Sequence, residues 1–270
     1  MSVRDTRHQQ KRASSRPRFA AKDLAVVYED KDILVVDKPV GLLAVSTPWE
    51  KKLTAHAVLT EYIRKGCGRS RKQLFVVHRL DRDTSGLLIF AKSEEAMLRL
   101  KDRWKEFEKK YLAVVHGSLQ KDSGVITTYL AEDRDLMMYS TRDSSRGKLA
   151  KTAYRVLKTT PRYSLLEVTL LTGRKNQIRV HLADIGHPIV GDTWYGKEGE
   201  KEPRMALHAW SLSFKHPFTG KQLAFTSAVP AFFTKLVGRI GEEHELSGEA
   251  VVRTEHGKTH HSPETSGHKT

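Results

Sequence analysis

The sequence predicts an α+β fold, with a mixed and mostly antiparallel β-sheet as its core and helices and loops on its flanks. Three observations support this prediction. The β-rich apolar runs are short, the amphipathic helical stretches are few, and the two kinds do not alternate as they do in a parallel βαβ protein. The length of 270 residues allows a domain with a substantial hydrophobic core.

Both ends of the chain lack the apolar residues that a packed core requires. Residues 1–22 are rich in Arg, Lys, Gln and Ser, and the residues after 240 are mostly Glu, His, Ser, Thr, Lys and Gly. Segments of this composition bury too little surface to offset the entropy lost on ordering. We therefore expect a disordered basic arm at 1–22, a folded domain at 23–240 and a disordered polar tail at 241–270.

The first half of the domain combines β-rich runs with two helical stretches. Lys38-Pro39-Val40-Gly41 ends the second run, because proline removes a backbone donor and glycine permits an unusual turn. Apolar residues at spacings of three and four, such as Leu100, Trp104 and Phe107, are typical of an amphipathic helix. The expected strands are 24–28, 33–37, 74–77, 87–91 and 111–115, and the expected helices are 53–65 and 93–108.

The second half of the domain is richer in strands. Residues 118–150 are weakly patterned and charged, so we expect short strands there and an exposed loop around 142–148. The turn at 216–220 separates two runs that can pair as a hairpin. The expected strands are 152–157, 164–170, 207–214 and 223–226, and a short helix at 232–240 closes the domain.

A further short helix is expected after residue 172. Ile178, Leu182 and Ile185 have helical spacing, Thr172 or Gly173 can cap the start, and Gly186 is suited to the end. Polar side chains are spread around this helix, so several should face a polar cleft or solvent. These side chains are Arg174, Gln177, Arg179 and His181.

The charge and cysteine content narrow the class of protein. The formal net charge is +15, and residues 1–240 carry 44 Lys and Arg against 26 Asp and Glu. This excess suggests a nucleic-acid partner, although charge alone does not distinguish RNA from DNA. The single cysteine, Cys67, excludes an intramolecular disulfide and a multi-cysteine zinc site. Since no apolar run approaches the ~20 residues of a membrane span and no apolar signal core is present, we expect a cytoplasmic monomer without membrane contact.

The segment from His78 to Gly86 places charged and hydroxyl side chains between two expected core strands. Asp81 lies between Arg79 and Arg82, and nearby positive charge favours an ionised carboxylate. Such a group can act as a nucleophile or general base, or it can simply form an Arg–Asp pair that stabilises a hairpin. Asp83 is a possible second catalytic carboxylate, but it begins a turn and is more simply a capping residue.

Metal ligation by His78, Asp81 and Asp83 is opposed by the positive charge around them, so we expect no metal site. The segment contains neither a glycine-rich phosphate loop nor a serine nucleophile elbow. What remains is an anionic Asp81 among cationic groups in a basic protein. This constellation suits a carboxylate that acts on a nucleotide while arginines hold its phosphates.

Several segments, in order along the chain, resemble the RluA family of pseudouridine synthases. The resemblance rests on His78-Arg79-Leu80-Asp81 with Thr84-Ser85-Gly86, and extends over roughly residues 24–237. The other matching segments are 30–41, the Lys-x-Tyr strand at 109–117, the Arg-containing motif at 173–181, the segment 186–192 with Tyr195-Gly196, Leu207-His208-Ala209 and His216-Pro217. The resemblance implies the pseudouridine synthase fold for residues 23–240.

The resemblance also implies roles for individual residues. Asp81 would attack the flipped uridine at the ring or at the anomeric carbon, Tyr111 would stack on the base and could move a proton, and Arg179 would pair with Asp81. Arg79 would hold the base out of its stack. The implied substrate-binding residues are His78, Arg79, Thr84, Lys109, Arg174 and Gln177. No cofactor is implied, and the substrate would be ribosomal or transfer RNA.

The sequence departs from the family pattern in two places. Asn176 stands where the family often has His, so an acid–base role at this position is in doubt. About twenty residues precede the catalytic region, too few for the small N-terminal RNA-binding domain of many members, so we expect the basic catalytic body, the arm, or both to hold RNA. Two alternatives stay open: a catalytically idle RNA-binding or ribosome-assembly protein on the same scaffold, and a hydrolase using Asp81 and Asp83.

Overall fold

A computed structural model describes residues 23–67, 69–240 and 251–254. The helices are α1 (Ala55–Arg64), α2 (Glu94–Asp102), the 3₁₀-helix η2 (Trp104–Glu106), α3 (Gln177–Asp184) and α4 (Ala231–Val237). The first six strands are β1 (Ala25–Glu29), β2 (Ile33–Lys38), β3 (Phe75–Val76), β4 (Ser85–Ala91), β5 (Glu108–His116) and β6 (Ser123–Glu132). The others are β7 (Met138–Thr141), β8 (Lys148–Thr159), β9 (Tyr163–Leu170), β10 (Leu207–Lys215), β11 (Gln222–Thr226) and β12 (Val251–Thr254).

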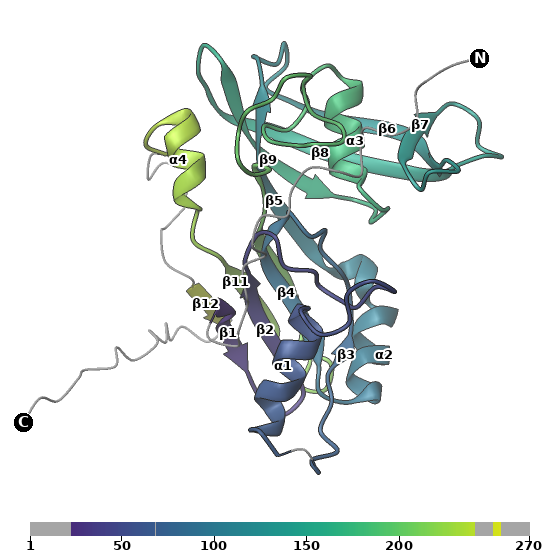
Figure 1. Cartoon of the computed structure of the whole chain (residues 1–270), viewed down its shortest axis with the longest axis vertical. Helices are drawn as coiled ribbons and strands as arrows, with labels where there is room; N and C mark the ends of the chain where they lie inside the picture. The colour runs from purple at the N-terminus through teal and green to yellow at the C-terminus, as the bar shows by residue number, and fades with distance from the viewer. Residues whose placement is uncertain (1–22, 68, 241–250, 255–270) are drawn as a thin grey trace, which may run out of the picture.

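These strands form one long mixed sheet, as the sequence predicts. Its order is β1-β2-β4-β10-β5-β9-β8-β6-β7, with β3 paired to β4 and with β11 and β12 continuing from β10. The pairing of β10 with β4 is parallel, and the other pairings between these strands are antiparallel. In Figure 1, β5 connects a lower part with α1 and α2 to an upper part with α3.

The two faces of the lower part follow from the alternation of side chains along the strands. Leu34 and Val36 of β2 pack on one face, whereas Ile33 and Val35 pack on the other. α1 covers the first face with Ala55, Leu59 and Ile63, and α2 covers the second face with Ala96 and Leu100. Each of these large apolar side chains contributes about 1.5–3 kcal/mol when it is fully buried. The two helices therefore cover opposite faces of the sheet at β2 and β4.

In the upper part, α3 packs on the curved end of the sheet. Val180 forms a small cluster with Leu130, Met138 and Ala150 from three strands. Figure 1 shows α3 lying across β6, β7 and β8. The packing against these three strands therefore fixes the position of the helix.

Several sequence expectations need correction. The helix predicted at 93–108 ends at Asp102, because the chain tightens into η2 and Phe107 then leads into β5. The region expected to hold only short strands contains β6, which is ten residues long and pairs with β8 along most of its length. These long antiparallel partners override the weak local pattern.

The start of α3 also differs from the expectation. The helix begins at Gln177, and its N-cap is Asn176 with φ 51, in the left-handed region, and not Thr172 or Gly173. Gln177 and His181 are buried, with 2% and 0% of their surface exposed, so neither faces solvent. Polar partners on β8 and neighbouring strands satisfy both side chains, which periodicity alone could not indicate.

Most of the basic arm and the polar tail lies outside the described residues. Within the tail, Val251–Thr254 form β12, which pairs antiparallel with β11. The expectation of disorder is therefore wrong for these four residues, whose backbone extends the sheet at an open edge. In the part of the chain that is described, none of the helices has both the length and the apolar character needed to cross a bilayer.

Candidate active site

Asp81 lies in the connection between β3 and β4, here named the Asp81 loop (residues 77–84), and this loop is held by hydrogen bonds. The amide of Thr84 donates to the carbonyl of Asp81 over 3.2 Å and closes a turn. The amide of Gly41 donates to the carbonyl of Arg82 over 2.9 Å, and Arg82 Nε donates to the carbonyl of Gly41 over 3.2 Å. The turn after β2 therefore holds the Asp81 loop in place through these hydrogen bonds.

A fully buried lysine joins the same two segments. Lys38 Nζ donates to the carbonyls of Pro39, Leu42 and Arg82 over 3.0, 2.8 and 3.1 Å. Burial lowers the pKa of Lys38 to about 7, against the opposing effect of nearby carboxylates, of which Asp83 is the strongest. The sequence pattern marks Lys38 only as the end of a strand. The missed signal is a cation directly after a buried apolar run, where it needs polar partners.

Gly86 allows the Asp81 loop to enter the sheet. Its φ is 108, and it stands opposite Ala209 where β4 and β10 run parallel. A Cβ atom at this position would lie 2.2 Å from the carbonyl oxygen of Ala209. Only glycine combines this conformation with so close an approach of two backbones.

Behind Gly86, a chain of buried hydrogen bonds crosses the sheet. Ser85 Oγ lies 2.9 Å from His208 Nδ1, and His208 Nε2 lies 3.0 Å from Ser227 Oγ. Ser227 Oγ donates to the Asp37 carboxylate. Burial, with a smaller effect from the Arg204 charge, lowers the pKa of His208 to about 3. His208 therefore supports the site as a neutral hydrogen-bonding residue.

The Asp81 carboxylate faces two side chains from the start of α3. Asn176 Nδ2 donates to Asp81 Oδ2 over 2.7 Å, and Arg179 NH1 lies 3.4 Å from the same oxygen. No described residue hydrogen-bonds to Asp81 Oδ1, and the side chain is 34% exposed. The carboxylate is thus oriented through one oxygen while the other is open to a ligand.

Arg179 makes its stronger interaction with another carboxylate. Its Nε and NH2 atoms donate to the two oxygens of Asp192, each over 2.7 Å, in a bidentate pair. The amides of Trp194 and Tyr195 donate to Asp192 Oδ1 over 2.9 and 3.1 Å. Burial would raise the pKa of Asp192, but Arg179 and these amides together lower it. The predicted pairing of Arg179 with Asp81 is present, but Asp192 is the residue that fixes the guanidinium.

Aromatic rings surround this ion-pair network. The Arg179 guanidinium carbon lies 5.0 Å from the ring centre of Tyr195 and 5.5 Å from that of Trp194, whose side chain is 60% exposed. Tyr111 on β5 is 8% exposed, and burial, followed by the charge of Asp81, raises its pKa above the ordinary value. Tyr111 therefore remains a neutral phenol beside the carboxylate. Asp192 and Trp194 are site residues that the sequence did not indicate, although Asp192 ends one matching segment and Trp194 directly precedes the matching pair Tyr195-Gly196.

The predicted substrate-binding residues divide into two groups. Arg79 is exposed, and no described residue forms a hydrogen bond or ion pair with its side chain. Arg174 is also exposed, although its Nε donates to the carbonyl of Leu149 over 3.1 Å. Thr84 is buried at the turn of the Asp81 loop. The two arginines are therefore the members of the set best placed to reach a ligand.

Gln177 is instead a clamp within the protein. Its Oε1 accepts from the Thr172 hydroxyl over 2.8 Å and from the Arg174 amide over 3.0 Å. Its Nε2 donates to the Lys151 carbonyl and to the Thr152 hydroxyl, over 3.0 and 2.9 Å. The bonding capacity of the amide is used in joining the segment before α3 to β8.

His78 and Lys109 both contact Trp104, on the face of the sheet that α2 covers. The amide of Ile89 donates to His78 Nε2 over 3.2 Å, and the imidazole packs on Trp104 with ring centres 4.8 Å apart. Lys109 Nζ donates to the carbonyls of Trp104 and Phe107 over 3.2 and 2.9 Å. Burial lowers the pKa of His78 to about 3, with a smaller effect from Lys109. These contacts indicate a supporting role for both residues.

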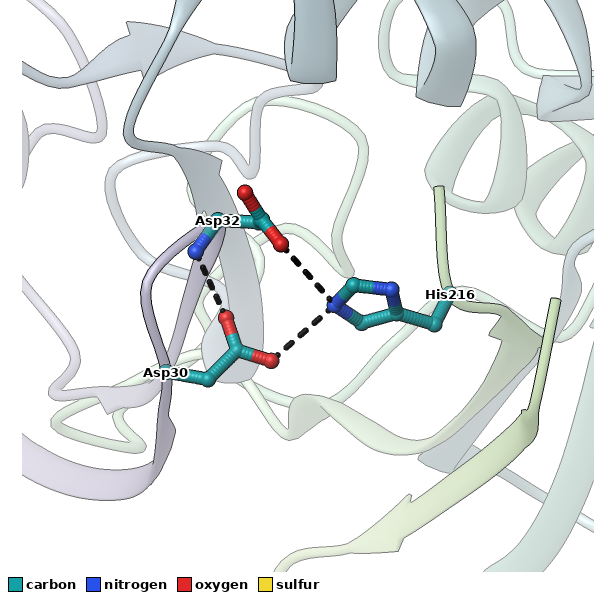
Figure 2. A group of neighbouring side chains, drawn as sticks. All are labelled: Asp30, Asp32 and His216. Carbon is teal, nitrogen blue, oxygen red and sulfur yellow. Dashed lines mark hydrogen bonds and ion pairs between the residues drawn. The ribbon is translucent and has the colours of Figure 1, made fainter. Parts of the chain in front are cut away.

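A separate cluster of Asp30, Asp32 and His216 could in principle hold a metal ion (Figure 2). His216 Nε2 lies 3.0 Å from Asp30 Oδ2 and 3.8 Å from Asp32 Oδ2. His216 Nδ1 accepts from the amides of Phe218 and Thr219 over 3.3 and 3.2 Å. The proton of a neutral ring must therefore sit on Nε2, which faces Asp30 and has no lone pair for a metal.

Hydrogen bonds also occupy the Asp30 carboxylate. Its Oδ1 accepts from the amides of Asp32 and Ile33, each over 2.8 Å, and its Oδ2 accepts from the Tyr28 hydroxyl over 2.9 Å. Burial would raise the pKa of Asp30, but these hydrogen bonds together lower it. The cluster fits a structural link between the β1–β2 turn and the β10–β11 turn better than a metal site.

Comparison with known proteins identifies the arrangement around Asp81. A family model described as RNA pseudouridylate synthase matches residues 32–184. A dual-specificity RNA pseudouridine synthase RluA from Pasteurella multocida is 37% identical over 217 residues, which cover 77% of this chain and 94% of that protein. The chain belongs to the RNA pseudouridylate synthase family. Within it, the relatives support the RluA family that the sequence motifs indicate.

Other similar proteins support the same family assignment. An uncharacterized RNA pseudouridine synthase, YlyB, from Bacillus subtilis is 37% identical over 80% of this chain and 72% of that protein. The ribosomal large subunit pseudouridine synthase D of Nitrosomonas europaea is 37% identical, over 77% of this chain and 62% of that protein.

Solved structures support the fold of the synthase. The human RNA pseudouridylate synthase domain containing 4 matches with a TM-score of 0.66 and 25% identity, covering 82% of this chain and 92% of that one. The human RNA pseudouridylate synthase domain containing 1 matches with a TM-score of 0.64 and 27% identity, covering 79% of this chain and 86% of that one. The predicted fold and the predicted class, an RNA pseudouridine synthase, are confirmed.

Proposed function

We propose that this synthase isomerises specific uridines in structured ribosomal or transfer RNA, with Asp81 as the residue that attacks the target nucleotide. One observation carries the proposal. Asn176 and Arg179 hold one oxygen of the Asp81 carboxylate, while no described residue hydrogen-bonds to the other. A carboxylate that is oriented and partly accessible is suited to nucleophilic attack or proton abstraction.

The reaction balances without a cofactor. The bond between the anomeric carbon and N1 of uracil breaks, the ring rotates, and a new bond joins the anomeric carbon to C5. The proton on C5 leaves and N1 gains one, so that no electron is lost or gained. Asp81 can attack the anomeric carbon or the uracil ring in this sequence, and either route returns the carboxylate unchanged.

The neighbouring residues have complementary roles in the proposal. Tyr111, as a neutral phenol beside Asp81, can contact the base and donate a hydrogen bond, but a phenolate base at neutral pH is disfavoured by its raised pKa. Arg179 would balance the charge on Asp81 and orient the carboxylate. Arg79 projects from the Asp81 loop without a protein partner among the described residues, which suits contact with RNA.

The target uridine must leave its stack before its glycosidic bond can be rearranged, at a cost of a few kcal/mol. Stacking on aromatic rings and arginine planes contributes about 1–3 kcal/mol per base and can offset that cost. We propose Arg79 and Tyr111 for this purpose, with Arg174 at the rim. His78, Thr84, Lys109 and Gln177 would support the pocket from behind it.

The test is to incubate the purified synthase with total unmodified RNA and to map pseudouridine, beside Asp81→Asn. We expect new pseudouridine at few positions with the wild type and none with the variant. RNA binding without any modification would favour the alternative of an idle RNA-binding or ribosome-assembly protein. Full activity of Asp81→Asn would show that the catalytic residue is misassigned.

A hydrolase that uses Asp81 and Asp83 as paired carboxylates has less support from the structure than the synthase reaction. Asp83 is exposed and makes no hydrogen bond to another described residue, so nothing in the protein orients it for a reaction. We also propose that the synthase acts as a cytoplasmic monomer. Light scattering after size exclusion tests the monomer, and fractionation of cells tests the cytoplasmic location.

A further inference from the structure

The outer side of α1 and the two segments that flank it carry an unusual density of positive charge. Residues 49–72 contain seven Lys and Arg against two Asp and Glu. Six of the cations are exposed, and no ion pair joins any of them to another described residue. We call these six residues the α1 surface: Lys51, Lys52, Lys65, Arg69, Arg71 and Lys72.

The α1 surface extends away from the Asp81 loop. At its near end, the amide of Ala55 donates to the carbonyl of Leu43, next to the segment that Lys38 ties to Arg82. At its far end, residues 69–72 lead into β3, which pairs with the end of β4 opposite Ser85. β4 has seven residues, so its own two ends lie about 20 Å apart. In Figure 1 the chain between α1 and β3 forms the lower end of the molecule.

The local structure holds this charge in place. Arg64 Nε donates to the carbonyl of Lys72 over 2.8 Å and so ties the loop after α1 back to the helix. A groove of about 820 Å³ follows the outer side of α1, and Lys51, Lys52 and Arg64 are among its lining residues. Trp49, beside the two lysines, is 91% exposed. Cations along a groove with an open aromatic ring are a typical binding surface for a nucleic-acid strand.

We propose that the α1 surface binds the sugar–phosphate backbone of the RNA that flanks the target uridine, outside the pocket around Asp81. This inference rests on the proposed function, because it takes the occupant to be the RNA substrate. RNA fits better than a protein partner, since residues 49–67 and 69–72 offer six exposed cations and two large exposed apolar side chains, Trp49 and Tyr62. The contact would add affinity and register without base-specific readout.

Charge reversal tests the proposal. The variant Arg69→Glu/Arg71→Glu/Lys72→Glu is compared with wild type in filter binding to an unmodified large-subunit ribosomal RNA transcript at several salt concentrations. We expect the Kd to rise at least about tenfold near 0.1 M salt, and the slope of log affinity against log salt to fall in magnitude by about three. The rate of pseudouridine formation at saturating enzyme should stay unchanged.

A matched control separates a local contact from overall charge. Lys101→Glu/Arg103→Glu/Lys105→Glu removes the same charge from exposed positions at the end of α2, on the opposite face of the sheet. We expect this control to raise the Kd less than about threefold, because at 0.1 M salt charges act over about 10 Å. Equal losses in the two triple variants would overturn the proposal. If the reversal unfolds the chain, the three Gln substitutions provide the same comparison.

Two further outcomes are distinguishable. If the α1 variant binds RNA as tightly as wild type, the inference is overturned. Loss of its binding to phosphatidylglycerol vesicles would then show that the α1 surface binds anionic lipid instead of RNA. A wild type that binds the transcript but modifies no uridine in any RNA would instead contradict the proposed function. In that case, the binding comparison between the two triple variants still decides whether the α1 surface holds RNA.

Discussion

Asp81 and Asp192 share one arginine but stand in opposite surroundings. Asp192 has a fully buried side chain and accepts two hydrogen bonds from Arg179 and two from backbone amides. Asp81 is 34% exposed, and only one of its oxygens is held. A saturated carboxylate has little capacity left for a reaction, whereas a half-satisfied one can gain a bond in the transition state. The comparison indicates that Asp192 positions Arg179 and that Asp81 performs the chemistry.

The largest expected effect concerns the reacting carboxylate. Asp81→Asn should lower the single-turnover rate of pseudouridine formation by more than about 10³-fold, because an amide can neither attack nor abstract a proton at this position. Its free energy of unfolding should change by less than about 1 kcal/mol, since the side chain is partly exposed. Chemical quench and urea denaturation measure the two quantities. A rate within tenfold of wild type would contradict the assignment.

Asp192→Asn should show the reverse balance. The substitution leaves the buried Arg179 without its bidentate partner, so the free energy of unfolding should fall by about 3–5 kcal/mol. Activity should fall as well, because Arg179 is then free to turn toward Asp81. Urea denaturation of the two Asn variants side by side gives the test. If Asp192→Asn is as stable as Asp81→Asn, the distinction between a positioning and a reacting carboxylate fails.

The hydrogen-bond chain from Ser85 through His208 to Asp37 resembles Asp192, because its polar groups are also satisfied within the protein. It predicts how the stability of the fold depends on pH. The pKa of His208 is lowered to about 3 in the folded protein from 6.5. The unfolded chain therefore binds a proton first as the pH falls, and the folded state loses stability between pH 6.5 and 3. Between pH 6.5 and 5 this loss is about 2 kcal/mol.

The variant His208→Gln keeps hydrogen-bonding groups but cannot titrate in this range. Its stability should therefore fall by about 2 kcal/mol less than that of wild type over the same pH interval. Urea titrations at pH 6.5 and pH 5 measure the difference. Equal pH dependence of the two proteins would mean that His208 does not stay neutral in the fold.

The smallest effect concerns Asn176, the second residue that holds Asp81. Asn176→Ala removes the donor to Asp81 Oδ2 and places alanine at φ 51, so the rate should fall about tenfold. Asn176→His should stay within about threefold of wild type, because histidine tolerates the left-handed region and retains an N–H donor. Single-turnover rates decide. An alanine variant at full rate would show that Arg179 alone orients Asp81.

Local signals in the sequence were sufficient for much of the fold and for the centre of the site. The continuous apolar runs of β2 and β4, the periodicity of α1 and the turn after β10 depend on neighbours a few residues apart. The segment from His78 to Gly86 also identified Asp81 from its charged flanks. The boundaries of α2 and the length of β6 could not be predicted, because strand pairing across the sheet determines them.

The sequence by itself determined the class of fold, the basic character and the residue most suited to catalysis, because these depend on composition and short-range pattern. Only the tertiary structure decided which polar residues serve the ligand and which serve the protein. Gln177, Lys109 and His78 carry the same chemical groups as binding residues, but other protein groups use them. The partners of Gln177 and His78 lie 25 and 11 residues away in the sequence, whereas the Lys109 ammonium bonds to the carbonyl of Phe107, two residues away. Arg179 could be matched to Asp81 by motif, whereas its tighter bond to Asp192 depends on the loop after α3 folding back onto the helix.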